Sequence, residues 1–149
     1  MEETPPVLRP HSAPATPAPT PPPEPTDWRD APITPGDWHW SAANGRSTAS
    51  FAGGRLELQC NLATRALTMF VRSGNARANA VMTVSTTSGT HALPAQPQAG
   101  GFAAALPAGS PAADAMAFSR GRFAVTLAGE QTLYIPSWTE VSRAIEDCR

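Results

Sequence analysis

The chain has 149 residues, and ten of its seventeen prolines fall within the first 26 positions. About 120 residues remain to fold, which is enough for one hydrophobic core but not for two. Charged residues make up only 15% of the chain, against a typical value of about 25%, and the formal net charge is -1. This charge balance argues against nucleic acid as a partner, and the lack of an apolar run of about 20 residues argues against a membrane-spanning segment.

Residues 1–26 consist largely of Pro, Ala and Thr. Such a segment buries too little apolar surface to offset the entropy lost on ordering, so we predict a disordered tether. Its prolines favour extended polyproline II, which suits a spacer; a ligand for a proline-binding module is the alternative. The predicted domains are therefore this tether and a single β-rich domain over residues 27–149.

The first half of the domain alternates apolar and polar residues with the period of two that is typical of strands. We predict strands over 37–41, 47–52, 55–60, 66–72 and 81–86. The connections are too short for helical crossovers, so an antiparallel meander is expected. Residues 90–110 are rich in Ala, Pro and Gly, and are interpreted as two short strands, near 91–93 and 102–106, joined by a loose loop.

The last third combines helical and strand patterns. Residues 111–118 predict one or two helical turns, and 122–127 with 132–135 predict a hairpin through Gly129 and Glu130. Ser137 and Glu140 have the spacing of a capping box at a helix start. The following residues Trp138, Val141, Ile145 and Cys148 share one face of that helix. The predicted fold is mainly β, an antiparallel β-sandwich or open barrel with a C-terminal helix packed on the sheet.

The two cysteines carry the most specific prediction. Cys60 lies on the apolar face of a predicted strand and Cys148 on the apolar face of the final helix, so both point toward the core. We expect a disulfide between them, which the chain-entropy model values at about 4 to 5 kcal/mol; two reduced buried cysteines are the alternative. A metal site is not expected, because the two cysteines form no C-x-x-C pair and have no histidine at ligand spacing.

A disulfide implies a periplasmic or extracellular compartment, since cytosolic thiols are kept reduced. The first residues contain neither a basic start nor an apolar stretch typical of an export signal. We therefore expect either a longer precursor or a chain that begins after a removed signal or lipoprotein-type anchor, with the protein in the periplasm or at the outer membrane.

Candidate site residues outside the cysteines are sparse. His39 lies between Trp38 and Trp40, with Asp37 on the same strand face, while His91 lies in an irregular region. A small hydrolase based on either histidine remains an alternative, although no G-x-S-x-G motif supports it. Phosphate-loop, dinucleotide and metalloprotease motifs are also lacking, so no cofactor is expected and the protein is interpreted as non-enzymatic.

Two groups of residues are possible binding elements. The tryptophans, Trp38 and Trp40 among them, can form a stacking platform for sugar or peptide, or can simply pack in the core. Arg120 and Arg122 flank Gly121 at the entrance of a strand, where they can grip an anion or form a solvated turn.

Two stretches carry a resemblance to known proteins. They are Asp27–Pro32 continuing through Thr34–Trp38, and Ala117–Phe123 continuing through Pro136–Trp138 to Glu146–Arg149. They resemble a group of short, uncharacterised envelope proteins of Gram-negative bacteria, which often have a signal or lipoprotein-like start followed by a proline-rich spacer. The closing order of strand, strand and helix is also weakly similar to invasion-associated locus B proteins, which are periplasmic β-sandwich proteins. Neither resemblance implies an activity or a functional residue.

Three functions follow as hypotheses. The first is a binding or structural module of the cell envelope, displayed on the spacer, whose partner is another envelope protein or a cell-wall component. The second is a proteinaceous inhibitor of a secreted hydrolase such as lysozyme, for which small disulfide-bonded domains with rigid loops are suited. The third is the hydrolase based on His39 or His91. The residues do not indicate the oligomeric state.

Overall fold

The computed structural model describes Pro6 and residues 27–149, so the tether predicted over residues 1–26 lies outside the described residues. In the described part the chain forms nine strands and two helices. The strands are β1 (Trp38–Ala43), β2 (Arg46–Phe51), β3 (Leu56–Asn61), β4 (Ala66–Arg72), β5 (Ala80–Thr86), β6 (Gly89–Gln98), β7 (Gly101–Ala105), β8 (Arg122–Leu127) and β9 (Leu133–Pro136). The helices are α1 (Pro111–Ala117) and α2 (Thr139–Asp147).

The strands form one open antiparallel sheet in the order β1-β2-β3-β4-β7-β6-β5-β8-β9. This confirms the predicted mainly β fold with a C-terminal helix on the sheet, here as one continuous sheet. The predicted simple meander is wrong at β5, which pairs with β6 and β8 rather than with β4. Residues 73–79 connect β4 to β5, which is not its neighbour in the sheet. The strand that pairs with β4 on that side is β7.

The short strand predicted near 91–93 and the first part of the predicted loose loop form one strand of ten residues, β6, that contains Pro94 and Pro97. Proline lacks the N–H through which a strand residue donates to a neighbouring strand, so Pro94 and Pro97 argue against a longer strand in the sequence. Here β6 pairs with β5 through residues 89–95 and with β7 through residues 95–98. Each proline therefore has a paired strand on one side only. Gly100, with φ of 86°, makes the tight turn into β7.

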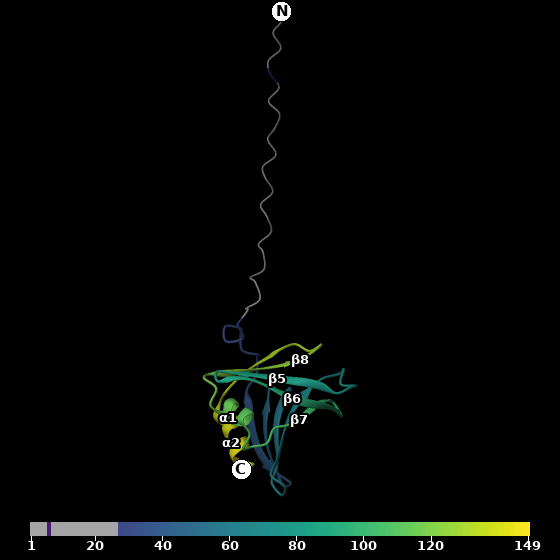
Figure 1. Ribbon diagram of the computed structural model, residues 1–149, viewed down its shortest axis with the longest axis vertical. Coiled ribbons are helices and arrows are strands. Elements are labelled where there is room, and N and C mark those ends of the chain that lie inside the picture. Colours follow the sequence, from purple (N-terminus) through teal and green to yellow (C-terminus); the bar gives the residue numbers. More distant parts are fainter. Residues whose placement is uncertain (1–5, 7–26) are drawn as a thin grey trace, which may run out of the picture.

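One face of the sheet forms the core. Alternate side chains of β2, β3 and β4 are buried, as the period of two predicts. Helix α2 packs on β1, β2 and β3, while α1 packs on α2 and β5. Figure 1 shows the two helices next to each other on the same side of the sheet, with the C-terminus beside α2. The largest fully buried side chains include Phe51, Phe123, Leu56, Leu58, Met69, Met82 and Ile145.

The two edges of the sheet approach each other around the segment that precedes β1. Thr34 runs beside the edge strand β9: its N–H donates to the Tyr134 carbonyl at 2.9 Å, and its hydroxyl accepts from the Tyr134 N–H at 2.9 Å. The indole of Trp38, in β1, donates to the Pro136 carbonyl at 2.8 Å. These contacts cover part of an edge that would otherwise expose unpaired backbone groups.

The start of α2 differs from the capping box expected of Ser137 and Glu140. The N-cap residue is Trp138, and its side chain makes no capping hydrogen bond. The Ser137 hydroxyl donates instead to the Met116 carbonyl at 2.8 Å, at the end of α1. Trp138 is 47% exposed, whereas Val141, further along the helix, is fully buried. The Ser137 hydroxyl therefore bonds to α1, and it does not form the capping box at the start of α2.

Candidate functional site

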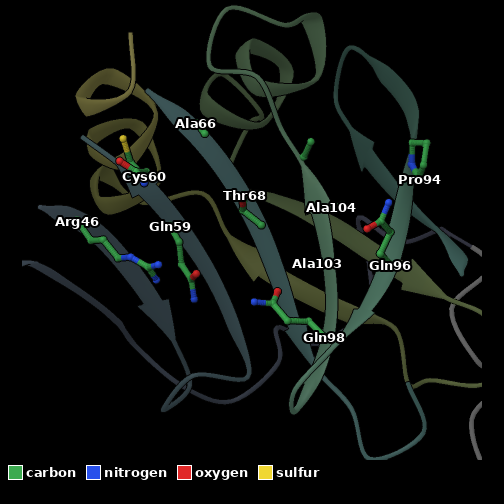
Figure 2. A pocket seen from close by; sticks show the side chains of 12 residues that line it. Arg46, Gln59, Cys60, Ala66, Thr68, Pro94, Gln96, Gln98, Ala103 and Ala104 are labelled. Atoms are coloured by element: carbon green, nitrogen blue, oxygen red, sulfur yellow. The ribbon is translucent and has the colours of Figure 1, made fainter. Parts of the chain in front are cut away.

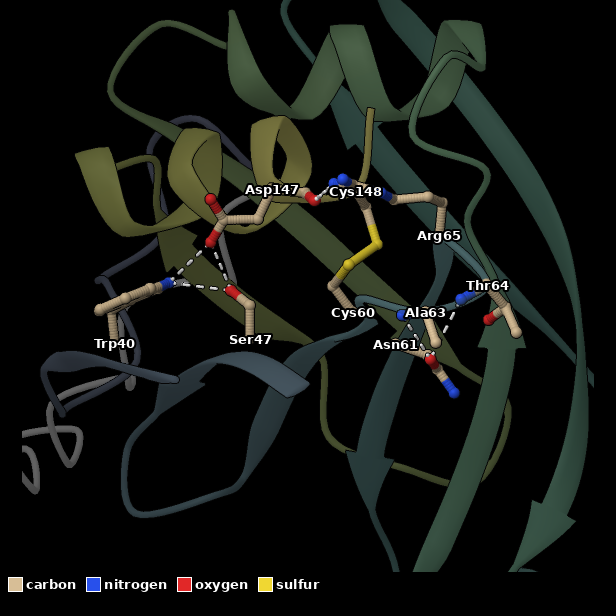
Figure 3. Close-up of a disulfide and its surroundings, with 9 residues drawn as sticks. All are labelled: Trp40, Ser47, Cys60, Asn61, Ala63, Thr64, Arg65, Asp147 and Cys148. Atoms are coloured by element: carbon tan, nitrogen blue, oxygen red, sulfur yellow. Dashed lines mark hydrogen bonds between the residues drawn. A yellow bond between two sulfur atoms is a disulfide. The ribbon is translucent and has the colours of Figure 1, made fainter. Parts of the chain in front are cut away.

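The predicted disulfide between Cys60 and Cys148 is confirmed. The two residues are 88 positions apart in the sequence, with Cα atoms 5.7 Å apart. Cys60 is fully buried in β3, and Cys148 is the C-cap residue of α2. The bond therefore attaches the end of the last helix to β3 (Figure 3). The bond is consistent with an oxidising compartment outside the cytoplasm.

Trp40 belongs to a polar cluster that ties the first hairpin to α2. The Asp147 carboxylate accepts from the Ser47 hydroxyl at 2.6 Å and from the Trp40 indole at 3.2 Å (Figure 3). The indole also lies 3.0 Å from the Ser47 hydroxyl. The Arg143 guanidinium covers the Trp40 ring, 3.5 Å from its centroid. One ring face and the polar edge of this predicted binding residue are therefore occupied within the domain.

The C-terminal residues add further contacts beside the disulfide. The Arg65 guanidinium donates to the Asp147 carbonyl. Arg149 donates to the Ala108 carbonyl at 3.1 Å and forms an ion pair with Asp114 of α1. These contacts connect α2 to the turn after β3 and to α1, so the end of the chain is fixed at several points.

Trp38, also a predicted binding residue, lies in the core. It is 4% exposed and packs against Phe51 with ring centroids 5.4 Å apart. Its N–H is satisfied by the Pro136 carbonyl. Trp38 and Trp40 are thus both engaged inside the domain, and the structure does not present them together as an open stacking surface.

The histidines considered for catalysis are placed differently from each other. His39 is exposed on edge strand β1. His91, in β6, lines a hollow of about 560 Å³ together with Ser88 and Asp114. Within the described residues no hydrogen bond joins His91 to either of them: the Ser88 hydroxyl lies 3.2 Å from that of Thr86, and Asp114 pairs with Arg149. Among the described residues, His91, Ser88 and Asp114 therefore form no hydrogen-bonded relay.

A second hollow, of about 550 Å³, lies on the outer face of the sheet (Figure 2). The small side chains of Ala103 and Ala105 in β7 line it, together with Gln59, Gln96 and Gln98, whose side chains carry amide groups. Arg46 also lines it, so the surface offers amide groups, which both donate and accept hydrogen bonds, beside one guanidinium group. These residues could not be predicted from the sequence, because the hollow depends on β7 lying between β4 and β6.

The third hollow, of about 730 Å³, brings Arg120 and Arg122 together with Arg29. Thr87, Ser88 and Phe118 complete its lining. We call it the arginine hollow. Arg120 and Arg122 were predicted as possible binding residues, but Arg29 was not, since its proximity to them depends on the segment before β1 folding back toward β8. Phe118 was not predicted either, because it is 75% exposed and carries no signal in the apolar periodicity.

Hydrogen bonds between loops hold the arginine hollow in place. Ser119, which is buried, accepts from the Thr87 N–H at 3.2 Å and donates to the Arg122 carbonyl. The Arg120 N–H donates to the Thr87 hydroxyl at 3.2 Å. The Arg122 guanidinium donates to the Ala31 carbonyl, which fixes the segment that carries Arg29. Three segments distant in the sequence therefore meet at defined positions.

Asp27 is the acidic residue paired with this group. Its carboxylate accepts from the Arg29 backbone N–H at 2.9 Å and forms an ion pair with the Arg29 guanidinium at 3.3 Å. The backbone hydrogen bond from Arg29 holds the pKa of Asp27 below its usual value; desolvation opposes this shift, and the charge and side-chain hydrogen bond of Arg29 lower the pKa by smaller amounts. The Arg29 guanidinium also lies 4.7 Å from the centroid of the Trp28 ring.

Among the described residues, no group of three or more His, Cys, Asp or Glu side chains is arranged to hold a metal ion. In the same part of the chain, no helix has the length and apolar character needed to cross a membrane. Comparisons of the chain with protein-family models, with curated proteins and with solved structures find no match. The resemblance to envelope proteins therefore stays a prediction.

Proposed function

We propose that this protein is a non-enzymatic binding or structural module of the bacterial cell envelope, located in the periplasm or held at the outer membrane. The observation that carries the proposal is the Cys60–Cys148 disulfide across the core. A bond of this kind persists where thiols are oxidised and is rare in the cytosol. The proline-rich composition of residues 1–26 agrees with a spacer that presents the domain to a partner.

The surface of the domain supports binding rather than catalysis. The arginine hollow and the amide-lined hollow offer hydrogen-bonding groups on a scaffold held by one sheet and a disulfide. Binding residues placed on loops above a rigid scaffold are a common arrangement in recognition domains. His91, in contrast, shares a hollow with Ser88 and Asp114 but makes no hydrogen bond to either among the described residues.

Cell fractionation with thiol alkylation tests the location. In the native host, we expect the protein in the envelope fraction with both cysteines protected from alkylation until a reductant is added. Recovery from the cytosol with two free thiols would contradict the proposal.

A pull-down from envelope extracts tests binding. The full chain with its disulfide intact serves as bait, and the reduced, alkylated chain serves as the matched control. We expect an envelope protein or a cell-wall fragment to be retained by the oxidised bait only. If both baits retain the same background, the binding proposal fails.

A further inference from the structure

We propose that the arginine hollow binds a phosphate group of an envelope ligand, with Phe118 contacting the less polar part of that ligand. The inference deepens the proposed function and rests on it, because it names the chemistry of the ligand. It is carried by the three guanidinium groups that the fold gathers at this hollow.

The charge at this place departs from that of the whole chain. The chain carries 11 basic and 12 acidic residues, for a net charge of -1, yet none of the described lining residues of the hollow is acidic. Asp27 offsets one of the three positive charges through its ion pair with Arg29. A local excess of positive charge remains, and it attracts an anion.

The guanidinium groups retain donors for a ligand. A guanidinium has five N–H donors. The Arg122 side chain uses one in the bond to the Ala31 carbonyl, and Arg29 uses Nη1 for Asp27. The Arg120 side chain makes no hydrogen bond to any other described residue and is exposed. Arginine forks of this kind bind phosphate oxygens in a bidentate manner.

The number of donors favours phosphate over carboxylate. A carboxylate has two oxygens and one charge, whereas a phosphate monoester has three free oxygens and up to two charges. Three guanidinium groups, with the hydroxyls of Thr87 and Ser88 beside them, match the larger group better. A carboxylate in this position leaves much of the positive charge uncompensated.

The hollow is organised before any ligand arrives. Ser119 joins the β5–β6 turn to the loop before β8, and Arg122 is anchored to the segment before β1. A ligand therefore meets positions that are already set, which lowers the entropy lost on binding. Phe118, at 75% exposure, adds an aromatic surface that the domain itself does not cover.

Calorimetric titration of the full, oxidised chain tests the proposal. The probes are inorganic phosphate, phenyl phosphate, and vesicles containing phosphatidic acid, whose headgroup is a phosphate monoester, with phosphatidylcholine vesicles as the reference. We expect phenyl phosphate or the phosphatidic acid vesicles to bind with a Kd of about 1 mM or tighter. Binding of phenyl phosphate alone indicates a soluble phosphate ester, and binding of the phosphatidic acid vesicles alone indicates a lipid headgroup. Either result supports the proposal, and binding of neither overturns it.

Arg120→Gln is the deciding variant, and Arg77→Gln, an exposed arginine in the loop before β5, is its matched control. Loss of the charged donor at residue 120 should weaken binding about tenfold or more, while Arg77→Gln should leave it unchanged. Phe118→Ala should weaken binding of phenyl phosphate but not of inorganic phosphate. Equal affinity for the two arginine variants overturns the proposal even where the protein is found in the envelope, so this failure is distinct from that of the proposed function.

Discussion

The last helix and the arginine hollow both join segments that are far apart in the sequence, but different bonds hold them. Helix α2 is fastened by the Cys60–Cys148 disulfide, the Trp40–Ser47–Asp147 cluster and the contacts of Arg149. The arginine hollow is held by hydrogen bonds around Ser119 and by the Arg122 contact with Ala31. The polar side chains of the first region bond to other groups of the domain. The guanidinium groups of the second region bond to the domain through only some of their N–H donors.

Removing the covalent bond should produce the largest effect. The double variant Cys60→Ala with Cys148→Ala should lose about 2 to 5 kcal/mol of unfolding free energy, because the unfolded chain is no longer constrained. Urea denaturation measures the loss. The unmodified protein treated with reductant should lose a similar amount, and the double variant should not respond to reductant. A loss below about 1 kcal/mol would show that the bond adds little to the fastening of α2.

Ser119→Ala should have the next largest effect and should act on the other region. It leaves the Thr87 N–H without its acceptor in a part-buried position, which should cost about 1 to 3 kcal/mol. Ser88→Ala, a lining residue with an exposed side chain, is the control and should change stability by about 0.5 kcal/mol or less. Equal effects in the two variants would contradict the structural part assigned to Ser119.

Asp147→Ala tests the polar cluster at α2. It removes the acceptor of the Ser47 hydroxyl and of the Trp40 indole, and should cost about 1 to 2 kcal/mol. The indole N–H resonance of Trp40 should shift at the same time. Glu146→Ala removes a neighbouring surface ion pair with Arg149 and should cost about 0.5 kcal/mol or less. If the two variants are equivalent, the cluster is not a stabilising contact.

Asp27→Asn should give the smallest effect, and it tests whether the charge at the arginine hollow governs the affinity for phosphate. Asn keeps an oxygen for the Arg29 N–H but removes the competing charge, so affinity for inorganic phosphate should rise by up to about fivefold. A fall in affinity on calorimetric titration would argue against phosphate near Arg29.

The ionisation of Asp27 is measurable in the unmodified protein. Because its pKa is lowered, the stabilising contact with Arg29 is present above the usual value of 3.8 and is lost as the pH falls through the lowered pKa. An NMR titration of the carboxyl group should therefore give a midpoint below 3.8. A midpoint at or above that value would contradict the Asp27–Arg29 contact.

The sequence predicted most reliably which side chains are buried, in strands and helices that turn one face toward the core. The alternation in β3 and β4 placed Leu58, Cys60 and Met69 correctly, and the spacing in α2 placed Ile145 and Cys148 toward the core. These patterns arise from contacts that each element makes with the same core, whichever strand lies beside it. The disulfide followed from them, because both cysteines are on buried faces.

The arginine hollow and the amide-lined hollow were much harder to predict from the sequence. Arg120 and Arg122 are close in the sequence and were identified, but Arg29 joins them only because Ala31 meets the Arg122 side chain. The amide-lined hollow arises only after β7 inserts between β4 and β6. Surface residues carry no periodic signal, since nothing in their local sequence requires burial.

The sequence by itself determined the β-rich character of the domain, the buried faces of most strands, the final helix and the cysteine pairing. Only the tertiary structure decided the strand order around β5, the strand character of β6 despite its two prolines, and the use of the Ser137 hydroxyl by α1. The physical reason is the range of the interactions. Burial patterns repeat locally along the chain, whereas strand neighbours, free strand edges and hydrogen-bond partners depend on residues tens of positions away.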